Sequence, residues 1–131
     1  MKGFAEDIEE LTRANKDFRR VLYTGKHLQL VLMALQPGEE IGEEVHADGD
    51  QFLRVEKGKA EVVIDGTRTH VKSGGGIVVP GGARHNVINT GDEPLLLYTL
   101  YGPPEHQDGI VRATRAEAKA SKEHFDGKTT E

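Results

Sequence analysis

Four polar residues stand at spacings that could bring them to one metal ion. Glu44 and His46 are two residues apart, Gln51 follows five residues later, and His85 lies further along the chain. In a β-strand, residues two apart point to the same face. Gln51 can return to that face if the next antiparallel strand begins near residue 50. The four side chains therefore predict one site inside a β structure.

The donor types indicate a divalent transition metal. Carboxylate, imidazole and amide oxygen donors suit Zn, Fe, Mn, Ni or Co, and two histidines with one carboxylate are also the ligands of non-haem iron oxygenases. The alternative is a hydrogen-bonded polar cluster without a metal. Burying a carboxylate beside two imidazoles without a cation is unfavourable, which favours the metal.

Other candidate residues are weaker. His106 follows the last expected strand in Pro103-Pro104-Glu105-His106 and could reach the site as an acid–base group, although a surface loop also explains it. Arg84 is the obvious cationic residue for a phosphate group, but it should point away from the His85 face by alternation. The remaining histidines, at predicted turns or ends, receive no role: His27, His70 and His124.

Short apolar segments separated by glycine turns must position these residues. Strands are expected at 18–24, 28–36, 41–46, 51–56, 59–64, 77–79, 84–89 and 95–101. Asp65-Gly66 is a strong two-residue hairpin signal, because such turns need positive φ at both positions. This pattern is typical of a β-sandwich or barrel.

Short helices flank the predicted barrel. Ile8 and Leu11 among charged residues indicate an amphipathic helix over 5–13, and residues 114–124 form a second, with Thr114 as N-cap and Glu117 at the capping-box position. We expect one domain over 1–131, with a barrel core over 18–102 and a helical tail over 103–131.

The segment from Leu28 to Leu35 is apolar on both faces, so both faces should be covered. One face would line the barrel interior. The other must meet a second sheet or another subunit, which predicts a homodimer.

Composition excludes several classes of protein. The net charge is −5 and the basic residues are scattered, which argues against nucleic-acid binding. No cysteine is present, so disulfides and thiolate sites are excluded, and no apolar stretch is long enough to span a membrane. The polar, acidic N-terminus is unlike a signal peptide, and we expect a cytoplasmic protein.

Two segments resemble the two motifs of the cupin superfamily. Gly38, five residues, Glu44-Val45-His46, four residues, Gln51, six residues and Gly58 match the spacing of the first motif. Gly74, five residues, Pro80-Gly81-Gly82, two residues, His85, three residues and Asn89 match the second motif in full. The first motif departs from the family pattern, because Glu44 replaces a histidine and Gln51 replaces a glutamate.

The resemblance implies an all-β cupin fold, a double-stranded β-helix or jelly roll, with one metal on Glu44, His46, Gln51 and His85. The ligand types are similar to those at the zinc of phosphomannose isomerases. They favour an enzyme that uses Lewis-acid catalysis, such as isomerisation, on a small sugar-like or carbonyl substrate. A metal-dependent dioxygenase, a non-catalytic binding or sensor cupin, and a structural dimer with an empty barrel are the alternatives.

Overall fold

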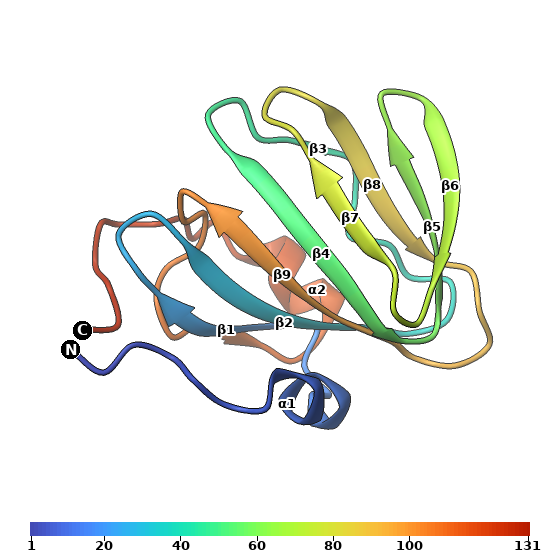
Figure 1. Ribbon diagram of the computed structural model, residues 1–131. Helices are drawn as coiled ribbons and strands as arrows, with labels where there is room; N and C mark the ends of the chain where they lie inside the picture. Colours follow the sequence, from blue (N-terminus) through green and yellow to red (C-terminus); the bar gives the residue numbers. More distant parts are fainter.

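The computed structural model describes residues 1–131 and consists of two antiparallel sheets with short helices outside them (Figure 1). One sheet has six strands in the order β10-β1-β2-β9-β4-β7, and the other has four in the order β3-β8-β5-β6. The elements are α1 (Ile8–Ala14), β1 (Arg19–Thr24), β2 (Gln29–Leu35), β3 (Glu44–Val45), β4 (Asp50–Lys57), β5 (Lys59–Ile64), β6 (Thr67–Lys72), β7 (Gly76–Val79), β8 (Arg84–Asn89), β9 (Leu95–Gly102), β10 (Val111–Arg112) and α2 (Arg115–Ala120).

The hydrophobic core lies between the two sheets. Alternate residues of the central strands point inward, and Leu53, Val55 and Leu97 are fully buried there beside Val31 and Val87. The inward positions of β4 follow the alternation that the sequence predicts, so Gln51 faces the interior and Arg54 faces outward. The all-β fold with short terminal helices is confirmed.

The turn between β5 and β6 follows from its two residues. Asp65 and Gly66 both adopt positive φ, at 46° and 83°. This conformation matches the right-handed twist of the paired strands, and aspartate followed by glycine is among the sequences that tolerate it. The hairpin predicted at this position is confirmed.

Four features of the tail and edges differ from the sequence prediction. The sheet does not end at Pro103, because β10 pairs with β1 through Arg19 and Arg112. The strand expected over 41–46 is only the two-residue β3, and the C-terminal helix is shorter than 114–124, although Thr114 is its N-cap as predicted. His70 lies within β6 instead of at a turn. No helix is long and apolar enough to cross a membrane.

Both faces of β2 are covered, as predicted, since all seven of its residues are buried. Its outer face continues across the sheet as one apolar row. In this row Val78 pairs with Phe52, Phe52 with Leu100, and Leu100 with Leu30. Val78 is 66% exposed at the open end of the row, so this end has no cover within the chain.

We propose that two copies of the chain associate through this row. Val78 is exposed and its neighbours Phe52 and Leu100 are half-buried, so this end of the row offers apolar surface to a second copy. Light scattering should give the mass of a dimer, and Val78→Lys should shift the protein to the monomer. Thr90→Lys, in an exposed turn, is the matched control and should remain dimeric. A monomeric wild type would contradict this prediction.

Candidate metal centre

Three side chains of different segments converge at one end of the barrel. Ligand atoms of Glu44, His46 and His85 all lie within 4.8 Å of one another. Glu44 in β3 is the register partner of His85 in β8, which places the two side chains on the same face of the four-stranded sheet. His46 follows one residue after the end of β3. The structure therefore brings together three of the four predicted ligands.

The loop before β8 holds His46 in place. Gly82 donates its backbone N–H to the carbonyl oxygen of His46 at 2.9 Å, and Gly81 donates to the Asp50 carboxylate at 2.8 Å. Gly82 has a φ of +88°, a conformation that residues with a side chain rarely adopt. The Pro80-Gly81-Gly82 motif therefore connects the loop that carries His46 to the strand that carries His85.

Each histidine has one ring nitrogen free for a metal. Nδ1 of His85 lies 3.1 Å from the carbonyl oxygen of Ala83 and donates to it, which leaves the lone pair on Nε2. Nδ1 of His46 lies 3.5 Å from the Glu105 carboxylate. Nε2 of His46 is 3.0 Å from Glu44 Oε2, but this buried nitrogen makes no hydrogen bond. A carbonyl or carboxylate behind each ring is the usual support of metal-binding histidines.

Gln51 lies on β4 as the register partner of Tyr101, whose ring is 5.7 Å from the ring of His46. Its Nε2 donates to Thr99 Oγ1 at 2.9 Å, so the amide is oriented. Its Oε1 is buried and accepts no hydrogen bond. An oriented amide oxygen without a donor suits a metal ligand, and the role of Gln51 as fourth ligand stays a prediction.

These side chains fit a divalent metal ion. Carboxylate, two imidazoles and an unpartnered amide oxygen provide donors of the types that Zn, Fe, Mn, Ni and Co accept. Unpaired buried acceptors are unfavourable unless a cation or a donor satisfies them. The cluster of Glu44, His46 and His85 could hold a metal ion.

The acid–base properties of Glu44 and His46 are coupled in the metal-free protein. Burial alone would raise the pKa of Glu44, but the contact with His46 and the positive charges of His46, Arg19 and His85 lower that pKa overall. The contact with Glu44 raises the pKa of His46, burial opposes the increase, and the charge of Glu105 adds to it. The metal-free site therefore favours a carboxylate paired with an imidazolium.

This pairing predicts a pH-dependent stability of the metal-free protein. The pKa of His46 is raised above 6.5, so its contribution is complete below pH 6.5 and disappears as the pH rises through the raised pKa. The pKa of Glu44 is lowered below 4.5, so its contribution disappears as the pH falls through the lowered pKa. The pair should therefore stabilise the fold most at pH values above the ordinary pKa of Glu44 and below the ordinary pKa of His46. Urea unfolding with a chelator should show the largest difference between wild type and Glu44→Gln there, and a difference independent of pH would contradict this.

Tyr101 connects the cluster to His106. The Tyr101 ring is 5.2 Å from the ring of His106, and burial strongly raises the pKa of its hydroxyl. His106 donates from Nδ1 to Glu123 Oε1 at 3.2 Å, and its side chain is only 14% exposed. His106 therefore lies in the loop between β9 and β10 with its side chain largely buried, and Tyr101 separates it from His46.

Two residues near the cluster were missed by sequence reasoning. Glu105 supports His46, and Tyr101 lies against it. Tyr101 shares the inward side of β9 with Leu97 and Thr99, a signal that strand alternation could have provided. Glu105 lies in a loop without regular period, so no sequence pattern could have placed it.

The remaining motif residues shape turns. Gly38, Gly58 and Gly74 all adopt positive φ. A Cβ on Gly58 would lie 3.0 Å from the carbonyl oxygen of Pro94, so glycine also permits a close approach of two chain segments there. Asn89 is 2% exposed and makes three hydrogen bonds, which join the end of β8 to the end of β2 and to the turn before β9.

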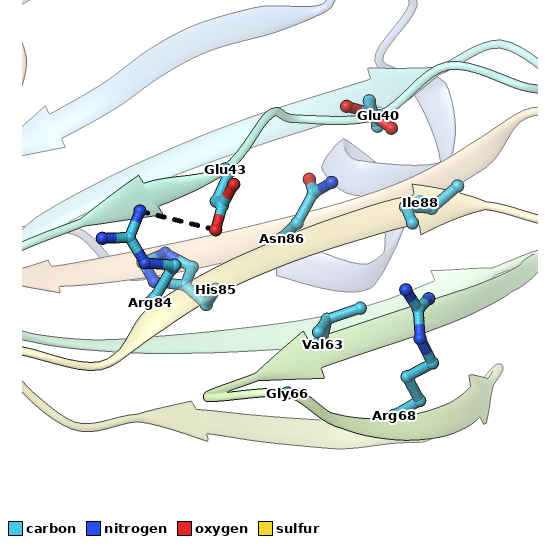
Figure 2. Close-up of a pocket in the computed structure, with 9 residues that line it drawn as sticks. All are labelled: Glu40, Glu43, Val63, Gly66, Arg68, Arg84, His85, Asn86 and Ile88. Atoms are coloured by element: carbon cyan, nitrogen blue, oxygen red, sulfur yellow. Dashed lines mark hydrogen bonds and ion pairs between the residues drawn. The ribbon is translucent and has the colours of Figure 1, made fainter.

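A pocket of about 440 Å³ lies on the outer face of the four-stranded sheet (Figure 2). It is lined by Glu40, Glu43, Val63, Gly66, Arg68, Arg84, His85, Asn86 and Ile88. Arg84 and Asn86 alternate with the buried His85 along β8, so the pocket opens on the opposite side from the metal cluster. Arg84, which is paired with Glu43 at 3.5 Å, points away from the cluster as predicted.

Comparisons with known proteins agree with this architecture. The protein YrkC of Bacillus subtilis (strain 168), described as uncharacterized, is 45% identical over 128 residues, which cover 93% of this chain and 69% of YrkC. The uncharacterized protein L612 of Acanthamoeba polyphaga mimivirus is 38% identical over 90% of this chain and 76% of its own length. The crystal structure of BH2720 from Bacillus halodurans superposes with a TM-score of 0.90 at 44% identity, covering 92% of this chain and 96% of that one.

The family is shown by a match to residues that extend from β2 to β9. Residues 31–101 match the Cupin domain family. This range contains both motifs and all four predicted ligands. The chain belongs to the Cupin domain family and has its jelly-roll fold.

Proposed function

We propose that this protein is a metal-dependent cupin enzyme that acts on a small oxygen-bearing organic molecule, with isomerisation of a sugar-like or carbonyl compound as its reaction. The observation that carries the proposal is the convergence of Glu44, His46 and His85 within 4.8 Å, together with the buried Oε1 of Gln51, which accepts no hydrogen bond. Small molecules are the partners that a closed barrel interior suits, and nucleic acid is not expected.

Glu44, His46, His85 and Gln51 would hold the ion. A bound Zn, Fe, Mn, Ni or Co ion polarises a carbonyl or hydroxyl oxygen and stabilises the negative charge that develops on it. The four residues supply one negative charge together, because Gln51 is neutral. The site with a divalent ion therefore keeps a net positive charge, which favours binding of an oxygen anion.

Residues beside the cluster could bind and move protons. Glu105 has a side chain that is 33% exposed and a carboxylate at 3.5 Å from His46, so it is accessible from solvent and close to the ligands. His106 holds its Nδ1 proton on Glu123, which leaves Nε2 as a proton acceptor. Tyr101 keeps its hydroxyl protonated because burial raises the pKa of this group. We propose His106 as the acid–base group and Tyr101 as a hydrogen-bond donor.

Two other functions fit the same residues. Two histidines and a carboxylate also suit ferrous iron, which supports a dioxygenase. A cupin that binds a small molecule without converting it would need the same cluster and no acid–base group. The experiment must therefore distinguish an isomerase, a dioxygenase and a non-catalytic binding protein.

Exchange of substrate hydrogen for deuterium distinguishes these three functions directly. The protein loaded with Zn or Mn is incubated in D₂O with dihydroxyacetone or hydroxyacetone, and NMR follows deuterium uptake at the carbon next to the carbonyl. Isomerase chemistry requires this exchange, and we expect it in the wild type and not in His85→Ala. Oxygen consumption by the iron-loaded protein is measured with the same compounds. Oxygen uptake without exchange would favour the dioxygenase, and binding with neither reaction would favour the binding cupin.

A further inference from the structure

Arg19 is a buried arginine that makes no side-chain hydrogen bond. It begins β1, points inward like Val21, and is 9% exposed. Its guanidinium has five N–H donors, and the buried Nε has no partner. A buried cation without hydrogen bonds is strongly unfavourable, so this side chain requires an explanation.

The neighbours of Arg19 do not satisfy it. The nearest carboxylate oxygen is Glu123 Oε1 at 3.8 Å, beyond hydrogen-bond distance. Glu123 therefore balances the charge of Arg19 as an ion pair, while its oxygens accept hydrogen bonds from His106 at 3.2 Å and from the backbone of Gln107 at 3.0 Å. The ring of Phe18 lies 5.8 Å from the guanidinium carbon and provides only a cation–π contact. The donors of Arg19 are therefore free for another acceptor.

Arg19 belongs to the polar interior that includes the metal centre. Glu123 links it to His106, the His106 ring contacts Tyr101, and the Tyr101 ring lies against His46. The positive charge of Arg19 also acts on the metal cluster, since it contributes to the lowered pKa of Glu44. The charge of Arg19 would therefore also act on a small molecule bound at the metal centre.

We propose that Arg19 binds a carboxylate of the small molecule whose other oxygen donor occupies the metal centre. The proposal rests on the proposed function and narrows its substrate to small organic acids. Arg84, the cationic residue considered for a phosphate group, points away from the site as expected, whereas Arg19 points into the interior.

A carboxylate suits this position better than a phosphate. The planar fork of one guanidinium matches the two oxygens of a carboxylate. Arg19 is the only arginine whose charge acts on Tyr101, and Glu44, Glu105 and Glu123 all add negative charge around this residue. A doubly charged phosphate would be repelled by these groups, whereas a carboxylate carries a single charge.

Succinate and its monoamide succinamate form a matched pair of probes. Both have one carboxylate for the metal, and only succinate has a second carboxylate for Arg19. The variants are Arg19→Gln and, as control, Arg20→Gln, because Arg20 is adjacent in sequence but half-exposed on the outer face beside Asp17. Titration calorimetry with the Mn-loaded proteins gives the affinities, elemental analysis gives the metal content, and thermal unfolding gives the stability.

We expect wild type and Arg20→Gln to bind succinate more tightly than succinamate. Arg19→Gln should lose this preference, with succinate affinity lowered about 10-fold to 100-fold, the effect of losing a charged hydrogen bond. Its metal content should be unchanged. Without succinate its unfolding temperature should change little, because the lost ion pair with Glu123 is offset by the removal of an unsatisfied buried donor.

Equal binding of both probes by the wild type, or an unchanged preference in Arg19→Gln, would overturn the proposal. A lower unfolding temperature with unchanged succinate binding would also overturn it, by identifying Arg19 as a structural partner of Glu123. Arg19→Lys, which keeps the charge, covers the case in which Arg19→Gln fails to fold. A wild type that takes up no metal would show instead that the proposed function is wrong. In that case the succinate and succinamate affinities of wild type and Arg19→Gln are compared in the metal-free proteins.

Discussion

Replacing either His46 or His85 with alanine is expected to abolish stoichiometric metal binding and to leave the fold largely intact. Each substitution removes one imidazole from a cluster in which all ligand atoms lie within 4.8 Å, and the remaining donors cannot close the coordination sphere. Neither residue belongs to the hydrophobic core between the sheets. Titration of the metal-free proteins with Zn or Mn, together with circular dichroism, measures both effects.

His70→Ala is the matched control for this experiment. His70 lies on β6 with a side chain that is 80% exposed and has no contact with the cluster. It should bind metal as the wild type does. Unchanged metal affinity in both His46→Ala and His85→Ala would show that the assigned site is wrong.

Asn89→Ala should have the opposite effect, with a large loss of stability and an unchanged metal stoichiometry. Asn89 donates to the carbonyl oxygens of Leu35 and Glu93 and accepts from the backbone of Gly91, at 2.9 Å each. Alanine would leave these backbone groups without hydrogen-bond partners, and water cannot replace them easily because Asn89 is only 2% exposed. We expect the free energy of unfolding to fall by about 3 kcal/mol. Urea denaturation measures this change.

Asn86→Ala is the comparison for that result. Asn86 lies on the same strand, faces outward, and makes one side-chain hydrogen bond, to the backbone of Gly42 at 2.9 Å. It should lose much less stability than Asn89→Ala. Equal losses in the two variants would mean that the hydrogen bonds of Asn89 do not hold the end of β8.

Local patterns were sufficient for much of the fold. Alternation in β4 placed Gln51 inward and Arg54 outward, and Asp65-Gly66 marked a hairpin. These features depend on neighbouring residues, so the sequence contains their signal. The spacing of the two motifs also predicted the convergence of Glu44, His46 and His85, because each motif spans two strands and the turn between them.

Features that depend on distant contacts were not predicted. β10 has only two residues, too few for a period, and it exists because it pairs with the start of β1. The support of His46 by Glu105 joins residues far apart in the chain. Arg19 was counted only among the scattered basic residues, although its alternation with the buried Val21 places it inside the barrel. Such contacts follow only from the closed fold.

Elemental analysis of the purified, tag-free wild type beside the His46→Ala/His85→Ala double variant tests the metal centre most directly. The account predicts about one equivalent of a divalent transition metal in the wild type, as expected for one site of this kind, and none in the double variant. Zinc would support isomerase chemistry, and iron would support oxygenation. A wild type that holds no metal, even after reconstitution with Zn, Fe, Mn, Ni and Co, would contradict the account.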